Sequence, residues 1–134
     1  MREFKFHHVG IAVKTLPEAI SQFASLFDYR LISGPFDDPI QHVSVCFLSR
    51  GDSDTVLELV APLGVKSPID RVLKQGGGTY HVCYEVPDIQ SAIARLTAQG
   101  CFLVSGPVPA VAFSMRDIAW LLTEAGLLVE LVQA

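Results

Sequence analysis

The stretch HHVGIAV at residues 7–13 has a second, altered copy, YHVCYEV, at residues 80–86. His8 matches His81 at an offset of 73 residues. The same offset continues through the segment after each copy, where three apolar positions match: Leu16, Ala19 and Ile20 with Ile89, Ala92 and Ile93. Such self-similarity at a fixed spacing indicates that one structural unit is used twice.

A second pair of matching stretches closes each half. LELV at residues 57–60 resembles VELV at residues 129–132, so that Glu58 matches Glu130 at an offset of 72 residues. Each half therefore starts with a histidine in one strand-like stretch and ends with a glutamate in another.

Local patterns predict similar elements in both halves. In the first half we expect a strand over residues 6–13, a helix over 17–27 and strands near 31–33, 42–49 and 55–60. The helix is predicted because apolar residues recur at helical spacing and because Pro17 suits a first turn. In the second half we expect a strand over 80–86, a helix over 88–98 and strands near 101–104, 110–114, 118–123 and 127–132. We therefore predict an α+β fold made of two tandem βαβββ modules.

The composition fits one packed domain and argues against some partners. Of the 134 residues, 50% are apolar and 18% are charged, and the formal net charge is −4. With 10 lysines and arginines and no basic cluster, a nucleic-acid partner is not expected. We also expect no membrane segment and no signal peptide. Because the three cysteines lack CxxC spacing, we expect Cys46 and Cys83 to be reduced core residues and the location to be cytoplasmic.

The repeated histidines and glutamates suggest a metal site. Glu58 and Glu130 each stand between two apolar residues. A charged group inside an apolar strand costs free energy unless it is paired or binds a cation. Two imidazoles and two carboxylates form a donor set that suits Zn, Ni, Co, Mn or Fe in the divalent state. A lone strand histidine is more often a core or surface residue, and this interpretation is kept for His7 and His42.

These stretches, together with VLELVAPLG at 56–64, KSPIDRVLKQGGGTYHVCYEVPDI at 66–89 and LLVELVQA at 127–134, resemble the vicinal oxygen chelate superfamily. The similarity covers nearly the whole chain and is to glyoxalase I-like proteins and methylmalonyl-CoA epimerases. It implies one domain with a cupped mixed β-sheet and flanking helices. That domain consists of module 1 (about 4–61), a linker (about 62–78) and module 2 (about 79–134). The resemblance also implies a homodimer.

The same resemblance implies that His8, Glu58, His81 and Glu130 are the ligands of one divalent metal ion, completed by both halves of the chain. Zn, Ni, Co or Mn is expected, and this ion is the one cofactor that we expect. Glu130 and Glu58 are implied as the catalytic carboxylates, since a metal-bound glutamate moves the proton in glyoxalase I-type enzymes. A bound ion can polarise a carbonyl next to the reacting carbon.

The resemblance to epimerases breaks at one position. Those enzymes carry a glutamate base just before the strand that corresponds to residues 41–48, and here Ile40 stands at that place. Isoleucine cannot transfer a proton. Neighbouring polar residues could replace the base only if the loop were re-registered. The turn signal Asp38-Pro39 favours the interpretation of Asp37 and Asp38 as solvated loop acids.

We therefore expect a metal-dependent lyase or isomerase that moves a proton next to a metal-chelated carbonyl or thioester. The expected substrate is a glutathione hemithioacetal or an acyl-CoA thioester. The alternative is a non-catalytic, antibiotic-binding protein of the same fold, against which the four intact ligand positions argue. An extradiol-type dioxygenase, with two histidines and one carboxylate on iron, fits less well. The sequence does not decide whether Trp120 lines the pocket or packs in the core.

Overall fold

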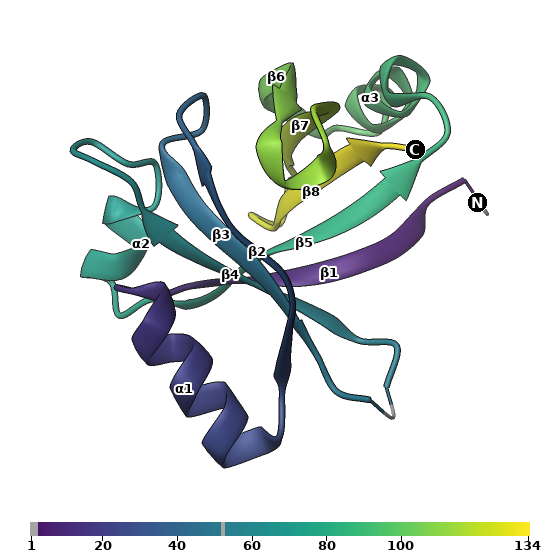
Figure 1. Cartoon of the computed structure of the whole chain (residues 1–134). Helices are drawn as coiled ribbons and strands as arrows, with labels where there is room; N and C mark the ends of the chain where they lie inside the picture. The colour runs from purple at the N-terminus through teal and green to yellow at the C-terminus, as the bar shows by residue number, and fades with distance from the viewer. Residues whose placement is uncertain (1–2, 52) are drawn as a thin grey trace. The chain divides into compact units, whose positions relative to one another are not determined.

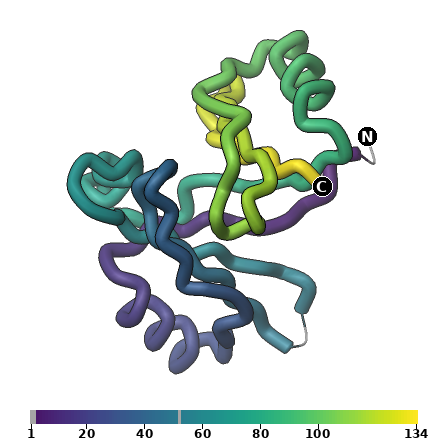
Figure 2. Tube along the Cα trace, turned by 45° about the horizontal axis from the view of Figure 1, so that its top comes forward, coloured from purple at the N-terminus to yellow at the C-terminus, as the bar shows by residue number. Residues whose placement is uncertain are grey.

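The structure is a computed structural model that describes residues 3–51 and 53–134. Contacts between residues divide it into two compact units. One unit consists of His8–Tyr80, and the other combines the described residues up to His7 with His81–Ala134. Figure 1 labels the elements of both units, and Figure 2 follows the chain from purple at the N-terminus to yellow at the C-terminus.

The unit His8–Tyr80 contains a four-stranded sheet and two helices. Its elements are β1 (Lys5–Ala12, which starts in the other unit), α1 (Leu16–Phe27), β2 (Arg30–Asp38), β3 (Val43–Ser49), β4 (Val56–Pro62) and α2 (Asp70–Lys74). The strand order is β2-β3-β4-β1. Strands β1 and β4 are parallel, whereas β2, β3 and β4 pair in antiparallel fashion.

The core of this unit lies between α1 and the sheet (Figure 1). Pro17 stands in the first turn of α1, as predicted, where its missing N–H costs no hydrogen bond. On β4 the alternate residues Leu57, Leu59 and Ala61 pack in this core. Because side chains alternate along a strand, Glu58 points to the face of the sheet opposite α1.

The other unit repeats this arrangement. Its elements are β5 (Gly78–Val86), α3 (Ile89–Ala98), β6 (Phe102–Ala110), the 3₁₀ helix η1 (Val111–Phe113), β7 (Arg116–Leu122) and β8 (Leu128–Gln133). The strand order is β5-β8-β7-β6, with β5 parallel to β8. The Asp88 side chain caps α3 by accepting hydrogen bonds from the backbone N–H groups of Gln90 and Ser91. Helix α3 packs its buried residues on the sheet, next to Leu131 of β8 and Leu121 of β7.

The predicted α+β class with two tandem βαβββ modules and flanking helices is confirmed. The predicted strand near 110–114 is wrong, because η1 occupies Val111–Phe113 and β7 starts only at Arg116. The strands predicted near 31–33 and 101–104 are too short. Both β2 and β6 continue through their Gly-Pro pairs by shifts of pairing register. In the described ranges, no helix is long and apolar enough to cross a membrane.

Candidate metal centre

The first predicted ligand pair lies within the unit His8–Tyr80. The Nε2 atom of His8 on β1 and the Oε1 atom of Glu58 on β4 are 3.3 Å apart, and both side chains are buried. In the parallel pairing of these strands Glu58 is opposite Gly10, two residues beyond His8. The two side chains are therefore diagonal neighbours on one face of the sheet. We call His8 and Glu58 the first half-site.

The second predicted ligand pair repeats this geometry in the other unit. The Nε2 atom of His81 on β5 and the Oε1 atom of Glu130 on β8 are also 3.3 Å apart and buried. Glu130 is opposite Cys83, again two residues beyond the histidine. We call His81 and Glu130 the second half-site. The sequence repeat is thus a repeat of side-chain geometry as well.

The chemistry of each half-site fits a divalent metal ion. A buried carboxylate is expensive without a cation or hydrogen-bond donors beside it. In each half-site one imidazole nitrogen and one carboxylate oxygen come together on a pair of neighbouring parallel strands. Nitrogen and oxygen donors of this kind suit Zn, Ni, Co and Mn.

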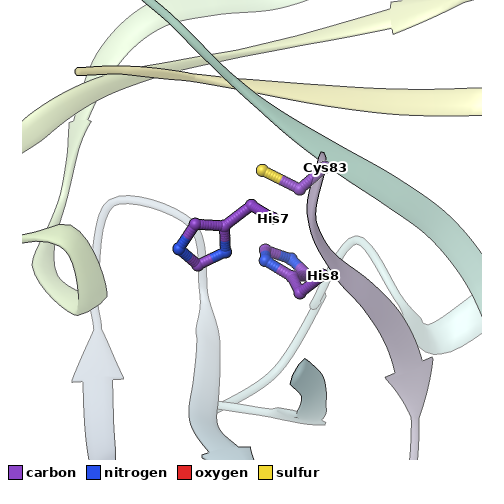
Figure 3. Close-up of side chains that lie close together, drawn as sticks. All are labelled: His7, His8 and Cys83. Carbon is purple, nitrogen blue, oxygen red and sulfur yellow. The ribbon is translucent and has the colours of Figure 1, made fainter. Parts of the chain in front are cut away.

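A further group of potential donors is found around His7. Figure 3 shows the consecutive histidines His7 and His8 of β1 and also Cys83 of β5. A ring nitrogen of His7 and the Sγ atom of Cys83, which belong to the same unit, lie within 4.8 Å of each other. The ring of His7 also contacts the Phe113 ring edge to face, at 5.3 Å between centroids. This proximity was not predicted from the sequence, because nothing in the repeat links His7 to Cys83.

The two cysteines predicted to be core residues are both buried and reduced. Burial raises the pKa of the Cys46 thiol to about 11, and the negative charge of nearby Glu58 acts in the same direction. A thiol with so high a pKa remains protonated near neutral pH and is a poor nucleophile. Cys46 therefore belongs to the core and not to the chemistry.

The segment around Ile40 differs from the prediction in one respect. Ile40 itself is exposed, but Asp38 is buried, at 3% exposure, so its interpretation as a solvated loop acid is wrong. The Oδ1 atom of Asp38 accepts hydrogen bonds from the backbone N–H groups of Ile40 and Gln41, each at 3.0 Å. Asp37 is exposed, as predicted, and accepts a hydrogen bond from the Ser44 hydroxyl. Asp38 thus holds the turn at the end of β2.

Two aromatic residues stand next to the half-sites. Trp120, which the sequence left open between pocket and core, is half-buried and contacts the ring of His81. Phe47 contacts the ring of His8 in the same manner and was not singled out from the sequence. Its position, 73 residues before Trp120, is the signal that could have found it.

Comparison with protein families places these pairs in context. The family model of the Glyoxalase/Bleomycin resistance protein/Dioxygenase superfamily matches residues 7–120. The chain belongs to this superfamily. The superfamily expected from the resemblance is thereby confirmed, and the model extends from β1 into β7.

Individual relatives narrow the similarity within the superfamily. An ethylmalonyl-CoA/methylmalonyl-CoA epimerase of Cereibacter sphaeroides is 34% identical over 133 residues, which cover 96% of this chain and 97% of the relative. Among solved structures, a hypothetical protein of Bacillus halodurans C-125 superimposes with a TM-score of 0.84 at 27% identity, covering 98% of this chain and 94% of the other. A methylmalonyl-CoA epimerase of Mycobacterium tuberculosis gives 0.82 at 27% identity, covering 96% and 87%. The expected similarity to epimerases is confirmed.

Proposed function

We propose that the protein is a metal-dependent epimerase that inverts the carbon next to the thioester carbonyl of an acyl-CoA. The observation that carries this proposal is the full-length similarity to the Cereibacter sphaeroides epimerase, 34% identical over nearly all of both chains. The two buried His–Glu half-sites support it, because they supply the donors that a metal-assisted proton transfer needs. The acyl-CoA substrate comes from the relatives' names and is part of the proposal.

We further propose that the two half-sites together bind one divalent ion, with His8, Glu58, His81 and Glu130 as ligands. Each half-site offers one imidazole and one carboxylate, and a metal site in a protein needs about four protein or water ligands. The matching offsets of the two pairs support a shared ion. When bound, such an ion supplies Lewis acidity that makes the proton next to a carbonyl easier to remove.

Glu58 and Glu130 are the proposed proton carriers. The position where epimerases of this family carry a second base is occupied by the exposed Ile40, and the Oδ1 atom of Asp38 is committed to the following turn. We therefore propose that one of these two carboxylates removes the proton to leave a planar enolate. The enolate then turns its opposite face to the same carboxyl group, which returns the proton there, so that the carbon is inverted. A single base of this kind allows a fraction of the substrate protons to return to the product.

Metal content and epimerisation test the proposal directly. The purified protein should contain about one divalent ion per chain, as measured by elemental mass spectrometry. It should also epimerise methylmalonyl-CoA. Chelation should abolish the activity, and re-addition of the ion should restore it. Glu130→Gln and Glu58→Gln should each lower kcat by about 10²-fold to 10⁴-fold. The exposed Glu18 in α1 provides the matched control, Glu18→Gln, which should behave as the wild type. An ion-free protein that epimerises at the full rate would refute the proposal.

Reaction in D₂O tests the single base. At low conversion the epimerised product should retain a measurable fraction of substrate protons, detected by mass spectrometry. Complete deuteration of the first product formed would contradict the return of the substrate proton, as expected for two bases, one on each side of the carbon, or for one base that exchanges its proton with solvent first.

Glyoxalase I-type isomerisation is the second candidate, and Ile40 favours it. That chemistry also moves a proton next to a carbonyl but does not need the base that Ile40 replaces. The test is the rate with the hemithioacetal of methylglyoxal and glutathione, compared with the rate with methylmalonyl-CoA. A larger kcat/KM for the hemithioacetal would move the assignment from epimerase to lyase.

The expected homodimer and the cytoplasmic location stay predictions. Light scattering after size-exclusion chromatography checks the dimer. The three cysteines, none of which forms a disulfide, support a reducing compartment such as the cytoplasm.

A further inference from the structure

An aromatic ring contacts the histidine of each half-site edge to face. In the first, the rings of His8 and Phe47 lie 5.5 Å apart between centroids at an interplanar angle of 65°. In the second, the rings of His81 and Trp120 lie 4.8 Å apart at 86°. Both pairs have the T-shaped geometry that aromatic rings prefer.

The register of the strands places each aromatic residue directly opposite the glutamate of the same half-site. Phe47 on β3 pairs with Glu58 on β4, and Trp120 on β7 pairs with Glu130 on β8. Directly opposite residues share one face of a sheet, with their Cβ atoms about 4.5–5.5 Å apart. Histidine, glutamate and aromatic ring therefore form one triad on three adjacent strands in each unit.

We propose that Phe47 and Trp120 are positioning residues, which hold the imidazoles of His8 and His81 in the orientation needed to bind the metal ion. Each ring occupies space in contact with the imidazole and therefore restricts the rotation of the histidine side chain. The proposal rests on the metal site of the proposed function. It adds a role for two apolar residues that cannot bind the ion themselves.

The two triads differ in their aromatic residue, and this difference provides a spectroscopic probe. Trp120 is the single tryptophan of the chain. Its contact with His81 puts the fluorophore beside a proposed ligand, so binding of Co²⁺ to the metal-free protein should quench its emission. The Phe47 contact has no such signal and has to be followed by metal affinity alone.

The chain also offers a matched control. Phe113 contacts the ring of His7 at 5.3 Å and 74°, which is the same type of contact in the same unit as Trp120. Phe113 is buried and His7 belongs to neither half-site. Phe113→Leu therefore removes an edge-to-face contact with a histidine without touching the proposed triads.

The experiment measures Zn²⁺ affinity by competition with a chelating dye and the visible spectrum of the Co²⁺-loaded protein. Trp120→Leu and Phe47→Leu should each weaken Zn²⁺ binding about tenfold, as loss of supporting contacts around metal ligands generally does. They should also change the Co²⁺ spectrum, which reports ligand geometry. Trp120→Phe should restore the affinity to within about twofold of the wild type, since the ring contact is retained.

The outcomes separate the two proposals. Equal Zn²⁺ affinity and unchanged Co²⁺ spectra in Trp120→Leu and Phe47→Leu would overturn the positioning role and leave the metal site intact. An equally large loss in Phe113→Leu would also overturn it, because the effect would then come from general loosening of the fold. Absence of divalent-ion binding by the wild-type protein would refute the metal site itself, and the positioning role with it.

Discussion

Replacement of Gly106 by alanine should destabilise the protein strongly, for two separable reasons. Gly106 lies inside β6 with a φ angle of +94°, where a residue with a Cβ atom is strained by about 1–2 kcal/mol. The added Cβ atom would also lie 2.6 Å from the carbonyl oxygen of Ile118 and 2.9 Å from the Cα atom of Ala119. Both are backbone atoms of the neighbouring β7, so relief requires a shift of the strand. Such overpacking costs about 1–3 kcal/mol, which brings the expected loss to about 2–5 kcal/mol.

Gly126→Ala isolates the first cause from the second. Gly126 has a φ angle of +91°, but a Cβ atom there would have no neighbour within 4 Å. Both substitutions place a Cβ atom on a residue with a positive φ angle, so backbone strain enters both, whereas the close contacts enter only Gly106→Ala. Urea denaturation should therefore give a free energy of unfolding that is lower for Gly106→Ala than for Gly126→Ala by about 1–3 kcal/mol.

The same substitution also connects stability to the proposed metal site. A shift of β7 at Ile118 and Ala119 moves the residue that follows, Trp120, so Gly106→Ala should weaken Zn²⁺ binding while Gly126→Ala should not. Equal stability of Gly106→Ala and Gly126→Ala would show that the close approach of β6 and β7 does not destabilise the alanine variant, which would contradict the prediction.

Three further predictions concern residues outside the half-sites. Because burial raises the pKa of Cys46 to about 11, its thiolate becomes abundant only near that pH, and Ellman's reagent should label the half-buried Cys101 at pH 8 well before Cys46. Asp38→Ala leaves two backbone N–H groups of the following turn without their acceptor and should lower the free energy of unfolding by about 1–3 kcal/mol, as measured in urea. Glu85→Gln neutralises the ion pair between Glu85 and Arg116, whose side chains are 27% and 38% exposed, and leaves the hydrogen bonds from Arg116 to the backbone oxygens of Phe113 and Gln133 in place. It should cost only about 1 kcal/mol, and less in 1 M salt, whereas a much larger loss would mean that the pair is not screened by solvent.

Most of the fold could be predicted from the sequence because each half of the repeat gives a second example of the same strands and helix. A strand or helix that is weak in one half is supported by its counterpart in the other. The prediction failed at residues 110–114, where Val111 and Phe113 resemble a strand. The backbone instead forms η1, with turn hydrogen bonds from Ser114 to Val111 and from Met115 to Ala110. Apolar, β-branched composition does not distinguish a short buried turn from a strand.

The ligand pairs were predictable because histidine and glutamate can bind metal ions and stand out in strands that are otherwise apolar. Phe47 was not, because a phenylalanine in an apolar strand looks like any core residue until the register places it opposite Glu58. Asp38 was misjudged for a related reason. A turn signal predicts where the chain bends, but not that the carboxylate at its start is buried and holds the turn.

The division of β1 between the two units affects the order in which parts of the protein can fold during synthesis. The unit His8–Tyr80 is continuous in the chain, so the ribosome completes it, first half-site included, before the other unit. At about 5–20 residues per second, residues 81–134 follow over about 3–11 s. Phe4 and Phe6 pack against the ring of Tyr84, which is added only at the beginning of that interval, after the whole of the unit His8–Tyr80. Two residues that precede the first-made unit in the chain therefore acquire their packing partner only after that unit has been synthesised.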